Sequence, residues 1–167
     1  MLADSILPSV ERDRMKNGNP HIDRGTVLAI PLGNEQWALS QVIQPGTSFY
    51  LGIAPEPVND PISASDIDGK YLRLFSWTND AEVYRGNWKN LGRFRMQPHP
   101  PIPEYKVNLS GTPSVVSFRG EKIRDFDPSK DKDLQFHKTR SPLLVQDAVQ
   151  AACGFRPWKS FYNDLKL

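Results

Sequence analysis

Alternating apolar and polar positions in the first half of the chain predict antiparallel β-structure. The clearest stretch is residues 25–44, GTVLAIPLGNEQWALSQVIQ, where two runs rich in β-branched and aromatic residues flank Gly33-Asn34. Such runs suit a pleated sheet, and a glycine–asparagine pair favours a tight reversal. We therefore predict a β-hairpin with strands over residues 25–32 and 36–43. Pro31 has no amide hydrogen for a ladder, so we expect it at an edge or a bulge.

The first strand of this hairpin is apolar on both faces. Leu28, Ile30 and Leu32 share one face because side chains alternate along a strand. Val27 and Ala29 occupy the other face. We expect both faces to be covered, as in a sandwich or a small closed barrel.

Short apolar runs between turn residues predict further strands. On the strand 71–77, Leu72 and Leu74 should point one way and Phe75 and Trp77 the other. The proline-containing segments 55–69 and 97–103 are expected to be loop and extended coil, and the charged stretch 125–139 a solvated turn or one helical turn. The predicted strands cover residues 48–54, 71–77, 88–96, 105–109, 114–119 and 122–124.

A helix over residues 142–153 is the clearest element of the second half. Ser141 is a suitable N-cap, Pro142 suits the first helical position, and Gly154 is placed for a C-cap. The stripe of this helix that should pack on the sheet consists of Leu144, Val145, Ala148, Val149 and Ala151 or Ala152.

A second short helix is expected near residues 158–165, with Phe161 and Leu165 on one side.

These elements predict an α+β fold that is mainly β. We expect a bent antiparallel sheet or a small SH3-like barrel, with the C-terminal helix packed on it. The 167 residues suit a single domain over residues 25–167, and the fifteen prolines argue against an all-helical fold. Residues 1–24 are expected to be an N-terminal arm, either loosely docked or carrying a short helix over 10–16 capped by Ser9.

The residue types that support catalysis or metal binding do not form a known pattern. His21, His99 and His137 lack partners at metal-ligand spacing, and no nucleophile or phosphate-loop motif occurs. Asp66 and Asp68 precede Gly69 but leave a calcium loop incomplete. Cys153, the single cysteine, ends the predicted helix, which favours a buried small apolar role over a reactive thiolate. We expect no cofactor, no metal and no enzymatic activity.

The compartment is predicted from what the chain lacks. The N-terminal stretch has no basic region followed by an apolar core, and no run approaches the roughly twenty apolar residues of a membrane span. A single cysteine fits a reducing compartment. We therefore expect a cytoplasmic protein.

Charge changes sign between two neighbouring segments. Residues 54–82 contain six acidic and two basic residues, whereas residues 84–106 contain five basic residues and one acidic one, interleaved with aromatics. Three interpretations stay open: a surface for single-stranded nucleic acid, a protein-binding surface, or pairing of the two segments with each other around a core that includes Trp88 and Phe94.

The opening hairpin resembles that of the immunity protein 26 family of bacterial polymorphic toxin systems. Members begin with a glycine, a hydrophobic strand ending in an Ile-Pro-Leu-like triplet, a turn and a second strand. Weaker similarity extends over residues 24–162, while Thr26 and Ser40-Gln41 depart from the acidic residue and the Gly-Arg pair common in the family. The matching residues are Gly25, Val27, Ala29, Ile30, Pro31, Leu32 and Trp37, followed by Phe49-Tyr50-Leu51, Trp88, Leu91-Gly92, Pro103, Tyr105-Lys106 and the helix around 141–152.

The resemblance implies an immunity protein that binds one cognate toxin domain and blocks it by steric and electrostatic occlusion. The alternatives are a small nucleic-acid-binding barrel and an endoribonuclease-toxin-like barrel. We expect the partner on the surface formed by the acidic loop 55–69 and the aromatic-basic segment 77–95, with the C-terminal 158–162 surface as the second candidate. The predicted partner-binding residues are Asp60, Asp66, Asp68, Arg73, Trp77, Tyr84, Arg85, Trp88, Arg93 and Arg95.

Overall fold

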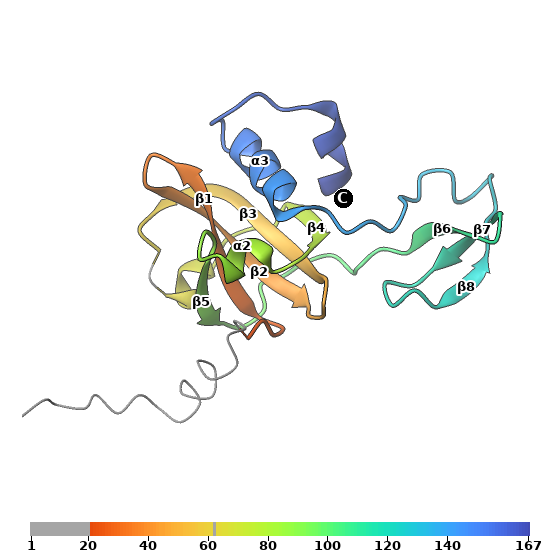
Figure 1. The fold of residues 1–167 in the computed structure, drawn as a ribbon, viewed down its shortest axis with the longest axis horizontal. Coiled ribbons are helices and arrows are strands. Elements are labelled where there is room, and N and C mark those ends of the chain that lie inside the picture. The colour runs from red at the N-terminus through yellow and green to blue at the C-terminus, as the bar shows by residue number, and fades with distance from the viewer. Residues whose placement is uncertain (1–20, 62) are drawn as a thin grey trace, which may run out of the picture.

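The computed structural model describes residues 21–61 and 63–167 and forms two antiparallel sheets with few helices (Figure 1). The predicted mainly β, α+β class is confirmed. The short helix predicted over 10–16 lies outside the described residues. The first sheet has the order β4-β3-β2-β1-β5, and the second has the order β6-β7-β8. The first sheet is open, with β4 and β5 at its edges, so it is a sheet and not a closed barrel.

The strands of the first sheet are β1 (Thr26–Gly33), β2 (Gln36–Gln44), β3 (Phe49–Asn59), β4 (Leu74–Thr78) and β5 (Lys89–Arg93). Those of the second sheet are β6 (Tyr105–Leu109), β7 (Thr112–Val116) and β8 (Lys122–Asp125). The helical elements are η1 (Ala64–Ile67), α2 (Ala81–Tyr84), α3 (Pro142–Ala152) and η2 (Ser160–Leu165).

The predicted hairpin forms β1 and β2, with its reversal one residue later than expected. Asn34 and Glu35 both have positive φ, 51° and 60°, as the two central residues of a type I′ hairpin turn require. The pairing of β1 with β2 shifts register between Pro31 and Gly33. Pro31 therefore lies at a bulge, as its missing amide hydrogen predicts.

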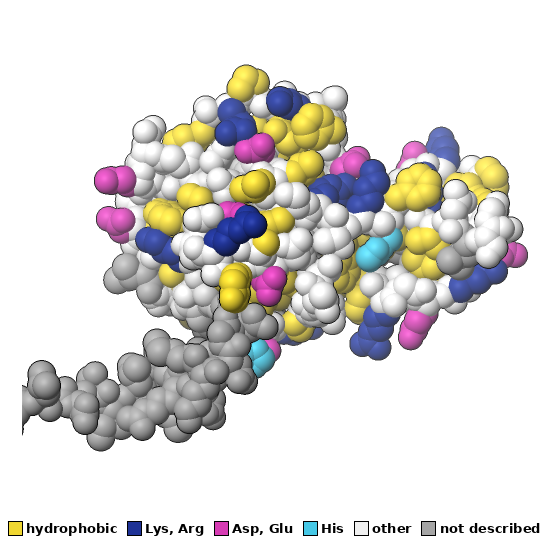
Figure 2. Space-filling view, in the orientation of Figure 1, with side chains coloured by type: hydrophobic (Ala, Val, Ile, Leu, Met, Phe, Trp, Pro, Cys, Tyr) yellow, Lys and Arg dark blue, Asp and Glu magenta, His cyan; other side chains and the backbone are white. Residues whose placement is uncertain are grey.

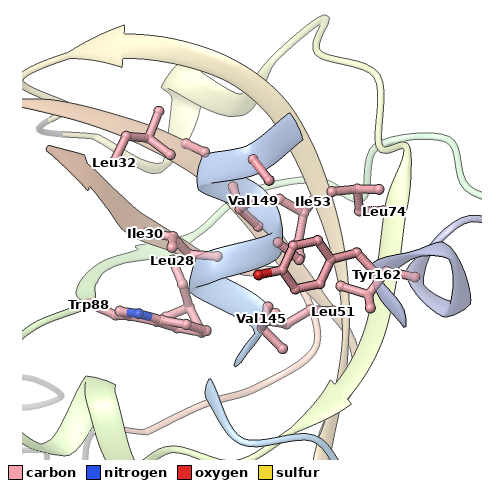
Figure 3. Close-up of a cluster of buried hydrophobic side chains, with 14 of the residues drawn as sticks. Leu28, Ile30, Leu32, Leu51, Ile53, Leu74, Trp88, Val145, Val149 and Tyr162 are labelled. Carbon is pink, nitrogen blue, oxygen red and sulfur yellow. The ribbon is translucent and has the colours of Figure 1, made fainter. Parts of the chain in front are cut away.

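Strand β1 is buried on both of its faces, as the sequence indicates. One face packs under α3 and η2, where Leu28 and Ile30 lie in a cluster with Val145, Val149 and Tyr162 (Figure 3). The other face, with Val27 and Ala29, packs in a second cluster that includes Ala64 and Ile67 of η1. The sheet therefore has apolar packing on both faces.

Two segments of the first sheet differ from the sequence prediction. Strand β3 continues through residues 55–59, and η1 occupies part of the remaining predicted loop. Strand β4 begins only at Leu74, so the expected alternation does not reach Leu72. Leu72 packs with Phe75 and Trp77, on the opposite face from Leu74.

Strand β5 is shorter than predicted because hydrogen bonds from the side chain of a buried glutamine replace strand pairing beyond the end of β5. The side-chain nitrogen of Gln41, Nε2, donates to the backbone carbonyl oxygens of Gly25, Phe94 and Arg95 at 3.0–3.2 Å. The side-chain oxygen of Gln41, Oε1, accepts from the backbone amide of Gln97 at 2.9 Å. The chain after Arg93 is therefore held by one side chain instead of by a continued strand.

Helix α3 has the predicted N-cap, since the Ser141 hydroxyl accepts from the Leu143 amide at 3.2 Å. Its buried face is turned slightly from the predicted one: Val145, Ala148, Val149 and Ala151 are buried, whereas Leu144 is half-buried. In η2 the prediction for Phe161 is wrong, because Phe161 is exposed and Tyr162 joins Leu165 in the core.

A strap, residues 135–140, joins the two sheets. At one end, the amide of Lys106 in β6 donates to Gln135 O at 2.9 Å. At the other end, the amide of Arg140 donates to Trp77 O in β4 at 2.9 Å. The stretch 125–139, predicted to be a solvated turn or one helical turn, is therefore instead bonded to both sheets through the strap. Its earlier part is also anchored, because buried Asp131 accepts hydrogen bonds from Arg124 and from the backbone amide of Asp127.

Candidate partner-binding surface

The two tryptophans predicted as partner anchors are core residues on opposite faces of the first sheet. Trp77 packs in the cluster beneath η1, and its Nε1 donates to the Tyr105 hydroxyl at 2.9 Å. Trp88 packs in the cluster beneath α3, and its Nε1 donates to Gln146 Oε1 at 2.9 Å. Neither indole is exposed, so neither can anchor a partner directly.

The predicted charged residues are largely paired within the protein. Arg95 and Asp68 form an ion pair at 2.6 Å that joins the basic and acidic segments, as one of the open interpretations expects. Arg85 of the basic segment pairs at 2.7 Å with Glu82, the buried last residue of the acidic segment. Arg93 lies 4.0 Å from Asp23. The exposed pair of Arg95 and Asp68 contributes little net stability.

The predicted surface divides between two faces of the protein. Tyr84 ends α2 and Arg85 is its C-cap, and α2 contacts α3. Asp66 and Asp68 belong to η1 and its C-cap, and η1 contacts β1, β2 and β5 on the other side of the sheet. Exposed Asp60 follows the end of β3. The ten predicted residues therefore do not form one patch.

Arg73 is the predicted residue that lies beside a well-formed depression, which we term the Arg73–Trp158 groove. It is an open groove of about 430 Å³, within the size range of small ligand-binding clefts. It is formed by β3, the start of β4, the end of α3 and the C-terminal segment. Its lining residues are Pro55, Arg73, Leu74, Ala152, Trp158, Lys166 and Leu167.

The aromatic wall of this groove is held in place by its neighbours. Trp158 Nε1 donates to Asn163 Oδ1 at 3.0 Å. The Trp158 ring also packs edge to face with the Tyr162 ring, and the two ring centres lie 5.3 Å apart. Lys166 Nζ lies 4.4 Å from the centre of the Trp158 ring. The wall is therefore preorganised for binding.

Two cations of this groove have no acidic partner within the described part of the chain. Arg73 and Lys166 form no ion pair with any described carboxylate, in contrast to Arg85, Arg95 and Arg140. Figure 2 shows exposed apolar side chains mixed with basic ones over the α3–η2 region of the protein. The groove combines an apolar wall with uncompensated positive charge.

A second groove, of about 320 Å³, lies where the strap meets the second sheet. It shares Lys166 and Leu167 with the first groove. Its other lining residues are Pro103, Glu104, Tyr105, Asp133, Leu134 and Gln135.

A small polar cavity adjoins this second groove, with room for about one water molecule. Tyr50, which is 2% exposed, lines it, and its hydroxyl has no hydrogen-bond partner of normal geometry among the described residues. Burial raises the pKa of Tyr50 and of Tyr105 and lowers the pKa of His137. All three groups are therefore neutral at pH 7 and form a structural aromatic cluster.

The thiol of Cys153 is also neutral. Burial raises the pKa of Cys153 to about 11, with a smaller contribution from the nearby charge of Glu56. Cys153 is half-buried against the α3 cluster, as its predicted apolar role implies.

Residues 21–61 and 63–167 contain no group of three or more His, Cys, Asp or Glu side chains arranged to hold a metal ion. None of the helices described is both long and apolar enough to cross a membrane.

Sequence reasoning missed Lys166 and the groove it completes. The available signal was the aromatic run 158–162 with lysines near both of its ends, at Lys159 and Lys166. Arg73 was identified as a partner residue, but its position next to Trp158 depends on the pairing of Leu74 with Lys166, which joins distant parts of the chain. Comparison of the chain with protein-family models, curated proteins and solved structures found no match in any of the three.

Proposed function

We propose that this protein is a cytoplasmic immunity protein that binds a cognate toxin domain and neutralises it by occlusion, without catalysis. The observation that carries the proposal is the Arg73–Trp158 groove. A fixed tryptophan beside an arginine is the composition of an energetic anchor at protein interfaces. The resemblance of residues 25–37 to the immunity protein 26 family supports the same class of function.

The ionisable groups favour binding over catalysis. A general acid or base works best with a pKa near the working pH. Burial moves the pKa values of Tyr50, His137 and Cys153 away from the range in which they would exchange protons or attack a substrate at neutral pH.

The basic segment 84–106 offers little surface for nucleic acid. Binding of single strands depends on exposed aromatic faces onto which bases stack. Trp88 and Tyr105 are buried and Phe94 is half-buried, which leaves Tyr84 as the exposed aromatic residue of that segment. A protein partner is therefore the favoured class.

The proposal expects a toxin gene immediately upstream of the gene for this protein, and the test is neutralisation of that toxin. The toxin domain is expressed alone and together with the full chain, and the purified proteins are mixed in a calorimeter. We expect restored growth and a stoichiometric complex. Growth arrest that persists despite co-expression, with no heat of binding, would overturn the proposal. Cleavage of RNA by the purified protein would instead favour the endoribonuclease alternative.

A further inference from the structure

We infer that the Arg73–Trp158 groove receives an acidic, apolar segment of the partner protein. A carboxylate of that segment lies between Arg73 and Lys166, and a neighbouring apolar side chain rests against Pro55, Leu74 and Trp158. This inference rests on the proposed function and specifies the chemistry of the partner surface.

The two cations of the groove are fixed relative to each other by the backbone. The amide of Arg73 donates to Ile53 O at 2.8 Å, which ties Arg73 to β3. Lys166 forms an antiparallel bridge with Leu74, the residue that follows Arg73. Both residues therefore start from the same sheet edge, and both line the groove that the partner enters.

Two acids that flank the groove are already engaged by other bases. Glu56, next to Pro55, lies 3.5 Å from Lys70. Asp164, two residues before Lys166, accepts from Arg140 at 3.1 Å and lies 4.0 Å from Lys138. Neither acid pairs with Arg73 or Lys166, which leaves both exposed cations open to a carboxylate of the partner.

Desolvation makes this requirement selective. An occupant that covers the groove removes water from two cations, and a buried cation without a partner is strongly unfavourable. A neutral or basic segment would leave both charges uncompensated, whereas a carboxylate restores the charge balance with strong hydrogen bonds. The groove therefore discriminates by charge as well as by shape.

The walls favour a protein segment over a nucleic acid. Pro55, Leu74 and Ala152 offer aliphatic surface, which complements apolar side chains. Trp158 is the one aromatic residue in the lining, and Lys166 already lies over its ring. The indole face on which a base would stack is thus partly occupied.

The decisive variant reverses both groove charges. We expect Arg73→Glu/Lys166→Glu to weaken binding of the toxin domain by at least one hundredfold in calorimetry. The matched control, Arg119→Glu/Lys130→Glu, changes two exposed cations in the segments that follow β7 and β8 and should bind within threefold of the parent. If the groove variant also binds within threefold while the parent protects cells, this inference is wrong and the proposed function stands.

A second measurement decides the inference independently of the toxin. The ¹⁵N-labelled full chain is titrated with a five-residue peptide, acetyl-Leu-Glu-Phe-Glu-Leu-amide, and with its glutamine analogue. We expect the amide signals of Arg73, Leu74 and Lys166 to shift with the glutamate peptide only. Equal shifts with both peptides, or none, overturn the inference even if the toxin is neutralised. Stronger shifts of the same signals with a single-stranded RNA 12-mer would replace the protein partner by nucleic acid.

Discussion

Trp88 and Gln146 are joined by a hydrogen bond of 2.9 Å between indole Nε1 and amide Oε1. The bond connects the residue that precedes β5 to the middle of α3. The backbone amide of Trp88 is also held, by the carbonyl oxygen of Glu82 at 3.0 Å. Trp88 thereby fixes α2 and α3 to the same face of the first sheet.

Replacement of Trp88 should therefore be among the costliest single changes in this chain. We expect Trp88→Ala to lower the free energy of unfolding by about 3–5 kcal/mol, because it leaves a large cavity beneath α3. Trp88→Phe keeps most of the ring but loses the bond to Gln146, which alone is worth about 1 kcal/mol. Urea unfolding measures both. Tyr71→Ala, at a site that is 70% exposed, is the control and should stay within about 0.5 kcal/mol of the parent.

The packing of α3 on the sheet predicts a contrast between two neighbouring faces of the helix. Val145 is fully buried, whereas Leu143 is 51% exposed. Val145→Ala removes two buried methyl groups and should destabilise the protein by about 2 kcal/mol. Leu143→Ala should change the free energy of unfolding by less than about 0.5 kcal/mol. Equal effects of the two substitutions would mean that the helix docks through a different face.

The surroundings of His137 predict a stability change at mildly acidic pH. Its ring lies against Tyr105 and Trp77, and burial lowers its pKa in the folded state. Below an unfolded pKa of about 6.5 the unfolded chain binds a proton that the folded chain does not, so stability falls. The stability is retained in full above the unfolded pKa of about 6.5. As the pH falls towards the folded pKa, it is lost by at most about 1.4 kcal/mol per pH unit.

The measurement is urea unfolding at several pH values between 5 and 8. His137→Asn should flatten the decline seen for the parent, whatever its effect on stability at pH 8. An unchanged slope in the His137→Asn variant would contradict the prediction.

The raised pKa of Cys153 predicts slow thiol chemistry. With a pKa of about 11 instead of 9, the thiolate fraction at pH 8 is roughly one hundredfold lower than for a freely exposed cysteine. Labelling with a chromogenic disulfide reagent should therefore be slow in the folded protein and fast in urea. Similar rates in the two conditions would show that the thiol is accessible and ionised.

Local sequence patterns were sufficient to predict the elements that are stabilised by residues close together in the chain. The hairpin of β1 and β2 follows from its turn and its β-branched residues, and the start of α3 follows from Ser141 and Pro142. The double-sided burial of β1 was also predictable, because both of its faces are apolar. In each case the residues that decide the structure are close together in the chain.

The features that sequence reasoning missed depend on distant contacts. The end of β5 is set by Gln41, more than fifty residues away, and Leu72 changes face because β4 begins at Leu74, three residues after the predicted start. The opposite placement of Trp77 and Trp88 is a matter of sheet topology, which alternation within one strand does not specify. For the same reason, the composition of residues 54–106 suggested one surface where the fold makes two.

The strap has a consequence for how other molecules can approach. An open sheet exposes unpaired amides and carbonyls at its edges, where a foreign strand can add and start aggregation. Here residues 139–140 and 166 are bridged to β4, and residues 135–137 are bonded to β6, so the chain covers these two edges itself. A toxin that docks in the adjoining grooves must therefore be recognised through side chains and cannot extend the sheet at β4.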